Sequence, residues 1–379
     1  MTTSKIKFAL AILINFCSLF SFFYLYAHEL SPNIANLKVE KNGVQIKFVT
    51  NLEAYITGVD FSMLDNTKDH NNLEYYKKLR ALGETELSSV FLNNWDEFTS
   101  LFTLTTEDGR KLDRFSFSFI EMEEIDNPEV PRLGTIHFFV EALGVKSITF
   151  KASKKLGDIV LRQEGVKNGV SQYLISGEKS VLISNNKMDR RTKVDIFFDY
   201  ILAGFYHILP KGIDHILFVM GLLFLTPKIA PLVMQISIFT LAHTITLAMS
   251  SLGLVTITAG VVEPLIALSI VYIAYENIFR PQLTKYRIIT IFLFGLLHGL
   301  GFASVLKAFG LPEENLILAL FGFNIGVEIG QITIVLVGFI ILTYLFKGIK
   351  RYRAYVTLPG SLFIGIFGLW WMFERILVS

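Results

Sequence analysis

The sequence predicts two fold classes in one chain: an exported all-β (sandwich-like) domain, followed by an all-α polytopic membrane domain of about six transmembrane helices. The main observation is an uneven distribution of charge. Only 18% of the 379 residues are charged and 52% are apolar, whereas soluble proteins usually carry about a quarter charged residues. Residues 28–193 hold 22 Lys/Arg and 24 Asp/Glu, but residues 194–379 hold only 11 and 9. The second part is therefore typical of a membrane domain.

Residues 1–27 predict a signal peptide or a signal anchor. Lys5 and Lys7 precede an uncharged, mostly apolar stretch at 8–27, and Ala27 lies at a plausible cleavage point. We expect cleavage after Ala27, with an uncleaved anchor as the alternative because the apolar stretch is long. In both cases the next domain is exported. Cys17 is the only cysteine, so cleavage leaves no thiol for a disulfide or for Cys-ligated metal.

Residues 28–193 predict the exported β-rich domain. Short alternating or β-branched stretches are separated by turn sequences such as Asn42-Gly43 and Asp108-Gly109. A β-sandwich is the simplest arrangement of such strands. Residues 55–95 interrupt the pattern and predict a partly helical segment. The domain carries no catalytic motif, and His70 and His137 are more typical of ordinary surface or core histidines than of metal ligands.

Residues 194–379 predict six membrane spans of roughly 20 residues. They lie near 212–227, 231–252, 259–279, 288–307, 315–346 and 355–376. Loops on one side carry Lys228, Arg280, Lys285, Arg287, Lys347, Lys350, Arg351 and Arg353, and the other side carries only Lys211, Lys307 and Arg375. The positive-inside rule then places the N-terminal domain in the periplasm and the spans in a bacterial inner membrane. Residues 196–208, before the first span, predict an amphipathic helix at the outer interface.

Ionisable residues at membrane depth are costly and therefore indicate function. By position along the spans, the outer group is His207, Asp214, His215 and Glu263, the middle group is His243, His298 and Glu328, and the inner group is Glu276 and Asn277. Asn324, Glu328 and Gln331 are spaced i, i+4, i+7 and share a helix face. Imidazole and carboxylate groups are ligands for divalent first-row metals. These residues therefore predict a metal path, with interhelical hydrogen bonding as the alternative.

His28 is a further candidate ligand, because cleavage after Ala27 makes it the N-terminal residue. Its free amine and imidazole would then chelate a divalent metal. The alternative is that a histidine lies beside the cleavage site by chance.

Five segments resemble the HupE/UreJ membrane-protein family, in its branch with an exported N-terminal extension. They are residues 204–218, 239–248, 262–277, 294–303 and 323–331, and residues 27–30 (AHEL) also look like that branch. The family is associated with nickel uptake for hydrogenase and urease maturation, so the resemblance implies a divalent-cation permease. The motif residues that carry over are His207, Asp214, His215 and His298. Six residues separate His207 from Asp214, whereas the nickel-transporting members have five at this place. Only one His-Gly pair is present here, whereas those members have two. The later glutamate of those members is absent, and Glu328 is a candidate replacement.

The sequence thus predicts an inner-membrane transporter of a divalent transition metal, nickel first and copper or cobalt next, with zinc also a possible ligand. The expected partners are the lipid bilayer, the metal ion, and metal-delivery or metalloenzyme-maturation proteins. A net charge of +2 gives no support for nucleic-acid binding. The alternatives are an intramembrane metal-dependent hydrolase, with Ser304 near His298, and an accessory membrane anchor for the exported domain. Neither H-E-x-x-H nor G-x-S-x-G is present to support the hydrolase.

Overall fold

The computed structural model describes residues 33–58, 73–123, 132–166, 169–184, 192–225, 228–255, 257–280, 282, 285–301, 316–346 and 352–378. These residues belong to two compact units, and the chain passes from one to the other between Asp199 and Tyr200. This division lies six residues after the boundary predicted at 193/194. The predicted signal segment, 1–27, and His28 lie outside the described residues.

The first unit contains two β-sheets, which confirms the predicted β-rich class. Its strands are β1 (Asn33–Glu40), β2 (Gly43–Thr50), β3 (Phe102–Thr106), β4 (Lys111–Leu112), β5 (Phe115–Met122), β6 (Gly134–Glu141), β7 (Ser147–Ala152), β8 (Ile159–Gln163), β9 (Ser171–Leu174) and β10 (Ile183–Ser184). One sheet has the order β5-β6-β2-β1-β8-β9 and the other β10-β7-β3-β4. The β1–β8 pair is parallel, and the hairpin β1–β2 is antiparallel.

Four short helices interrupt the strands where the alternating pattern is lost. They are α2 (Leu52–Ile56), α3 (Leu73–Arg80), α4 (Glu84–Leu92) and α5 (Trp95–Ser100), and a 3-10 turn, η2 (Lys154–Leu156), follows β7. Their apolar faces add rings to a core that the strands supply from alternate positions. Phe98 of α5 packs edge-to-face on Phe102, with ring centroids 5.0 Å apart, and Phe102 packs on Phe48 of β2 at 5.1 Å. Such aromatic burial supplies much of the stability of a small β domain.

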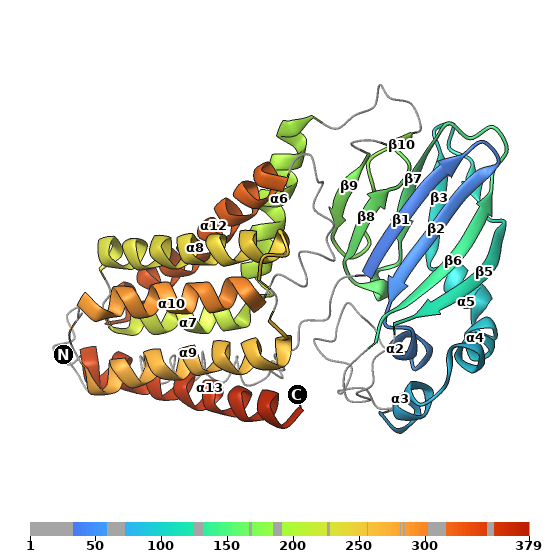
Figure 1. The fold of residues 1–379 in the computed structure, drawn as a ribbon. Helices are drawn as coiled ribbons and strands as arrows, with labels where there is room; N and C mark the ends of the chain where they lie inside the picture. The colour runs from blue at the N-terminus through green and yellow to red at the C-terminus, as the bar shows by residue number, and fades with distance from the viewer. Residues whose placement is uncertain are drawn as a thin grey trace. The chain divides into compact units, whose positions relative to one another are not determined.

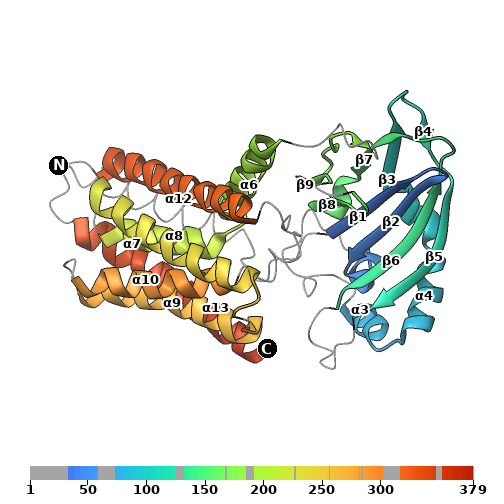
Figure 2. The ribbon, with the colours of Figure 1, turned by 45° about the horizontal axis from the view of Figure 1, so that its top comes forward.

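The second unit is entirely helical over its described residues (Figures 1 and 2). Its elements are α6 (Lys193–Ile208), α7 (Ile213–Leu225), α8 (Ile229–Ser251), α9 (Ala259–Phe279), α10 (Lys285–Gly301), α12 (Leu316–Phe346), the π-helical turn η4 (Arg353–Thr357) and α13 (Leu358–Val378). The division between the units falls inside α6, after Asp199. Both views show α8, α9, α10 and α13 as neighbouring rods. Every described helix from α7 to α13 is strongly apolar, as a membrane bundle requires.

Four helices are long and apolar enough to cross a membrane, and a fifth span results if α6 and α7 count as one broken span. The four are Ile229–Ser251, Gly260–Phe279, Leu316–Tyr344 and Arg353–Leu377, and α6 and α7 are bent by 71° at their junction. The count is below the predicted six because α7 has only 13 residues and the described part of α10 has 17. The expected helix at 196–208 is present as α6.

Glycines allow the helices of this bundle to approach to backbone contact. A Cβ atom added at Gly204 of α6 would lie 1.9 Å from the carbonyl oxygen of Phe323 in α12. One added at Gly299 of α10 would lie 2.4 Å from the carbonyl oxygen of His243 in α8. Small residues at helix contacts are typical of membrane bundles. Here they bring α6, α8, α10 and α12 close enough for side chains from different spans to meet.

Candidate metal site

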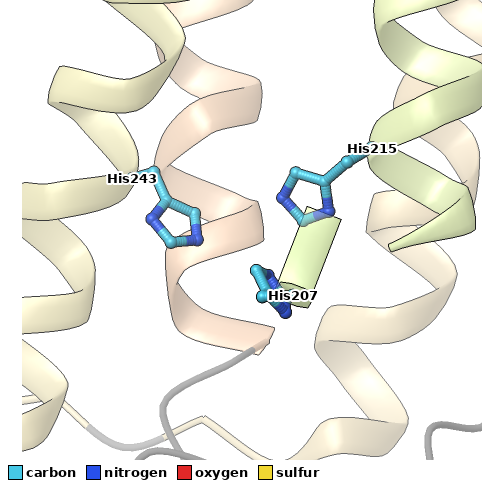
Figure 3. A group of neighbouring side chains, drawn as sticks. All are labelled: His207, His215 and His243. Carbon is cyan, nitrogen blue, oxygen red and sulfur yellow. The ribbon is translucent and has the colours of Figure 1, made fainter. Parts of the chain in front are cut away.

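Three histidines from three helices meet inside the helical unit. His207 lies in the last turn of α6, His215 in the first turn of α7, and His243 in α8. One ring nitrogen from each lies within 4.8 Å of those of the other two, and all three residues are buried. Figure 3 shows the three rings around a common space. This spacing is suited to three ligands of one metal ion.

The break between α6 and α7 creates this meeting point. Pro210 has no backbone N–H and cannot continue the helix. Gly212 then permits a tight turn, because a Cβ atom there would lie 2.4 Å from the carbonyl oxygen of His207. The turn brings the rings of His207 and His215 to a centroid distance of 4.9 Å.

A fourth histidine borders the same cluster. The ring of His298, in α10, lies 4.9 Å from that of His215, and only 1% of the residue is exposed. Positions along the spans predict two successive histidine layers, whereas the rings form one cluster. The reason is that the broken α6–α7 pair carries His207 and His215 to the depth of His243, which lies eight residues before the end of α8.

Hydrogen bonds fix the orientation of three of the four imidazoles. The Nδ1 atom of His215 lies 3.0 Å from Oδ1 of Asp214, that of His243 lies 3.2 Å from Oδ1 of Asn324, and that of His298 lies 2.9 Å from the carbonyl oxygen of Phe294. The Asn324 amide is oriented in turn by its Nδ2, which donates to the Leu320 carbonyl at 2.8 Å. All three partners are acceptors, so each Nδ1 carries the proton and each Nε2 keeps its lone pair.

The Nε2 atoms of His215, His243 and His298 are buried and have no hydrogen-bond partner among the described residues. Unsatisfied buried polar atoms are rare in folded proteins and cost about 1–3 kcal/mol each. A metal ion at the centre of the cluster would satisfy them. Nδ1 bound to an acceptor and Nε2 free for the ion is the usual arrangement of a metal-binding histidine.

Asp214, Asn324 and Glu328, three of the predicted ligands, contact polar side chains of the bundle. Asp214 and Asn324 accept hydrogen bonds from histidine rings, so they orient the cluster from outside it. Glu328, one turn after Asn324, accepts a hydrogen bond from the Ser237 hydroxyl at 2.6 Å. It does not belong to the three-histidine group, so the geometry gives no support for Glu328 as a replacement ligand.

Glu263 and Glu276 lie at opposite ends of α9. They are thirteen residues apart in the sequence, which is about 20 Å along a helix. Glu263 faces Arg375 of α13, with Oε2 and Nε 3.7 Å apart. Glu276 forms a buried ion pair with Arg287, at 2.8 Å. Neither belongs to the three-histidine group. Ser304, the serine invoked for a hydrolase, lies outside the described residues.

The HupE / UreJ protein family model matches residues 184–375, about half of the chain. The chain belongs to the HupE/UreJ family. This confirms the resemblance expected from the sequence, and family membership indicates a membrane role related to transition-metal transport. The matched region contains all four histidines of the cluster and the described helices of the membrane unit except the last three residues of α13, but none of the strands β1–β9. No curated protein and no solved structure matches the chain.

Sequence reasoning missed two sets of residues beside the HupE/UreJ histidines. The ring of Phe239 packs against that of His298, with centroids 4.9 Å apart. The sequence feature that could have identified it is its position four residues, or one helical turn, before His243. Phe294 lies four residues before His298 in the same way. The sequence predicts Arg287 in a basic inner loop, whereas the structure places it in the first turn of α10, where it is only 2% exposed and binds Glu276. No local signal distinguishes such an arginine from a loop residue, because its partner lies on another helix.

Proposed function

We propose that this HupE/UreJ chain transports a divalent transition-metal ion across the bacterial inner membrane, with nickel as the first candidate and cobalt or copper next. One observation carries the proposal. His207, His215 and His243 meet at a helix break inside an apolar bundle with His298 beside them, and the buried Nε2 atoms of His215, His243 and His298 have no hydrogen-bond partner among the described residues. The ion is the cargo of the protein.

The imidazole donors favour a transition-metal ion that prefers nitrogen ligands over Ca²⁺ or Mg²⁺. Imidazole suits nickel, copper and zinc, whereas calcium and magnesium require several oxygen ligands. Asp214 contacts the cluster through the His215 ring, with its Oδ1 3.0 Å from Nδ1, and such a carboxylate fixes the orientation of a metal-binding histidine. Four imidazoles without a directly bound carboxylate leave much of the ion's charge uncompensated. The uncompensated charge lowers the affinity for the ion, and a moderate affinity suits a site that must also release its ion.

Topology supports entry from the periplasm. We assign residues 1–27 as the signal segment, 28–193 as the exported domain and 194–379 as the membrane domain. The basic loops then face the cytoplasm, and the α6–α7 junction with Asp214 lies at the outer end of the bundle. The exported domain would deliver the ion or control its access. Metal-delivery or metalloenzyme-maturation proteins would receive it on the inner side.

Substitution of the cluster tests this proposal. We expect His215→Ala and His298→Ala each to abolish saturable Ni²⁺ binding to the purified protein and Ni²⁺ uptake into proteoliposomes. His137→Ala, in β6 of the other unit, is the matched control and leaves both measurements unchanged. Binding is measured by elemental analysis and calorimetry with Ni²⁺, Co²⁺, Cu²⁺ and Zn²⁺, on samples that elute as a single species.

Two outcomes would contradict the proposal. One is uptake by His215→Ala protein at the wild-type rate. The other is a wild-type protein that binds none of the four metals. A tightly held, non-exchanging zinc would instead favour an intramembrane hydrolase.

A further inference from the structure

A layer of aromatic rings lies directly against the histidine cluster. Phe218 follows His215 by three residues on α7, Phe239 precedes His243 by four on α8, and Phe294 precedes His298 by four on α10. Residues three or four apart are one helical turn apart on the same face. Because His215, His243 and His298 lie together, Phe218, Phe239 and Phe294 form a second layer. Each phenylalanine lies one helical turn further from the α6–α7 junction than the histidine on the same helix.

The rings of this aromatic layer pack on one another. Phe218 lies 4.9 Å from Phe239 and 6.1 Å from Phe294, and Phe294 lies 5.6 Å from Tyr272 of α9. Phe218 and Phe239 are each only 1% exposed. A cation leaving the histidines in this direction meets apolar rings from α7, α8 and α10, and apolar constrictions block ions until they open.

Beyond the aromatic layer, a polar network ties the same helices together. Arg287 of α10 donates to Glu276 of α9 at 2.8 Å, to Gln235 of α8 at 3.1 Å, and to Oδ1 of Asn277 at 3.3 Å. The Asn277 amide donates to the carbonyl of Gly221 in α7 at 2.7 Å and to the Ser361 hydroxyl in α13 at 3.0 Å. One network, centred on Arg287 and Asn277, therefore joins five helices.

The acidic side chains at the two ends of the bundle differ in exposure, although their basic partners His215, Arg375 and Arg287 are all buried. The side chains of Glu276 and Arg287 are 3% and 2% exposed. At the other end, the side chains of Asp214 and Glu263 are 23% and 26% exposed. A buried ion pair adds little net stability compared with apolar packing. A role in opening and closing explains such a pair better than a role in stability alone.

We propose that the aromatic layer and the Glu276–Arg287 network form the closed inner gate of the transport path. This inference rests on the proposed function. The histidine cluster then communicates with the end that carries Asp214. Release of the ion at the other end requires Glu276 to separate from Arg287 and the rings of Phe218, Phe239 and Phe294 to move apart.

A thiol placed between the two layers reports on the gate. Cys17→Ser removes the only cysteine of the chain. Ile291→Cys then puts one thiol on α10 at a buried position, three residues from Phe294 and four from Arg287. Inside-out membrane vesicles are treated with a membrane-impermeant cationic thiol reagent. We expect Glu276→Gln to raise the modification rate about tenfold, which corresponds to about 1.4 kcal/mol in the closed–open equilibrium.

Two controls accompany this measurement. The exchanged pair, Glu276→Arg with Arg287→Glu, restores slow modification because it rebuilds the ion pair. Thr290→Ala removes a hydroxyl that donates to the Tyr286 carbonyl at 3.1 Å on the same helix. It lies outside the network and leaves the rate slow. Phe239→Ala opens the aromatic layer alone, so we expect it to raise the rate when the reagent is added from the opposite face, in right-side-out vesicles.

A second measurement leaves the Glu276–Arg287 ion pair unchanged, so it also serves if the Glu276→Gln protein does not fold. Saturating Ni²⁺ drives turnover in the protein with only the thiol substitutions, and we expect faster modification than without Ni²⁺. The inference is wrong if neither Ni²⁺ nor any of the gate variants changes the rate while the protein still transports Ni²⁺. A wild-type protein that binds no metal would instead remove the proposed function, so the two failures are distinguishable.

Discussion

At the scale of single residues, the orientation of each ring matters as much as its position. His243 contributes its Nε2 lone pair because Asn324 holds its Nδ1 proton. Asn324 would thus act on a metal bound at the proposed site through His243. This differs from the ligand role that its sequence position suggests, and it is the role of an orienting partner behind a metal-binding histidine.

Replacing Asn324 tests this role. We expect Asn324→Leu, which has no acceptor, to weaken Ni²⁺ binding about 10–100-fold, the usual cost of losing such a partner. Asn324→Asp keeps an acceptor oxygen and retains most of the affinity. Calorimetry gives the affinity, and the visible spectrum of bound Co²⁺ reports changed ligand geometry. Equal affinities and spectra for the two variants would show that Asn324 does not orient His243.

At the scale of helices, two contacts at glycines and one helix break build the site. The break at Pro210 turns α7 away from α6, and Gly299 lets α10 lie against the backbone of α8 at His243. Gly204 gives α6 the same close contact with α12, which carries Asn324. Each contact places one member of the cluster.

Gly204→Ala should therefore be costly. Its Cβ would lie 1.9 Å from the Phe323 carbonyl, so α6 and α12 must separate, at about 1–3 kcal/mol by analogy with overpacked cores. We expect a lower melting temperature in detergent and weaker Ni²⁺ binding. Gly83→Ala is the control, because no atom lies within 4 Å of a Cβ at that position. Equal melting temperatures for the two variants would contradict the close contact.

At the scale of the whole molecule, the chain consists of two units with separate cores. The core of the β-rich unit consists of residues of that unit alone, so it does not need the membrane helices to bury its apolar side chains. Such a domain has the requirements for independent folding.

A fragment of residues 28–199 should fold cooperatively by itself. Phe98→Ala in this fragment should destabilise it by about 3–5 kcal/mol, because a fully buried phenylalanine leaves a cavity. Urea unfolding followed by tryptophan fluorescence, from Trp95 beside Phe98, measures both statements. Non-cooperative unfolding of the wild-type fragment would show that the β-rich unit depends on the rest of the chain.

The sequence by itself determined the two-part organisation, the apolar spans and which ionisable residues lie among them. Composition, hydropathy and turn residues are local properties, so they can be read without knowing which helices touch. The tertiary structure alone decided that His207, His215, His243 and His298 form one cluster, and that Asn324 orients a ring. It also paired Glu276 with Arg287. The physical reason is that these relations depend on a helix break and on backbone contacts at glycines, which bring together side chains from distant parts of the chain.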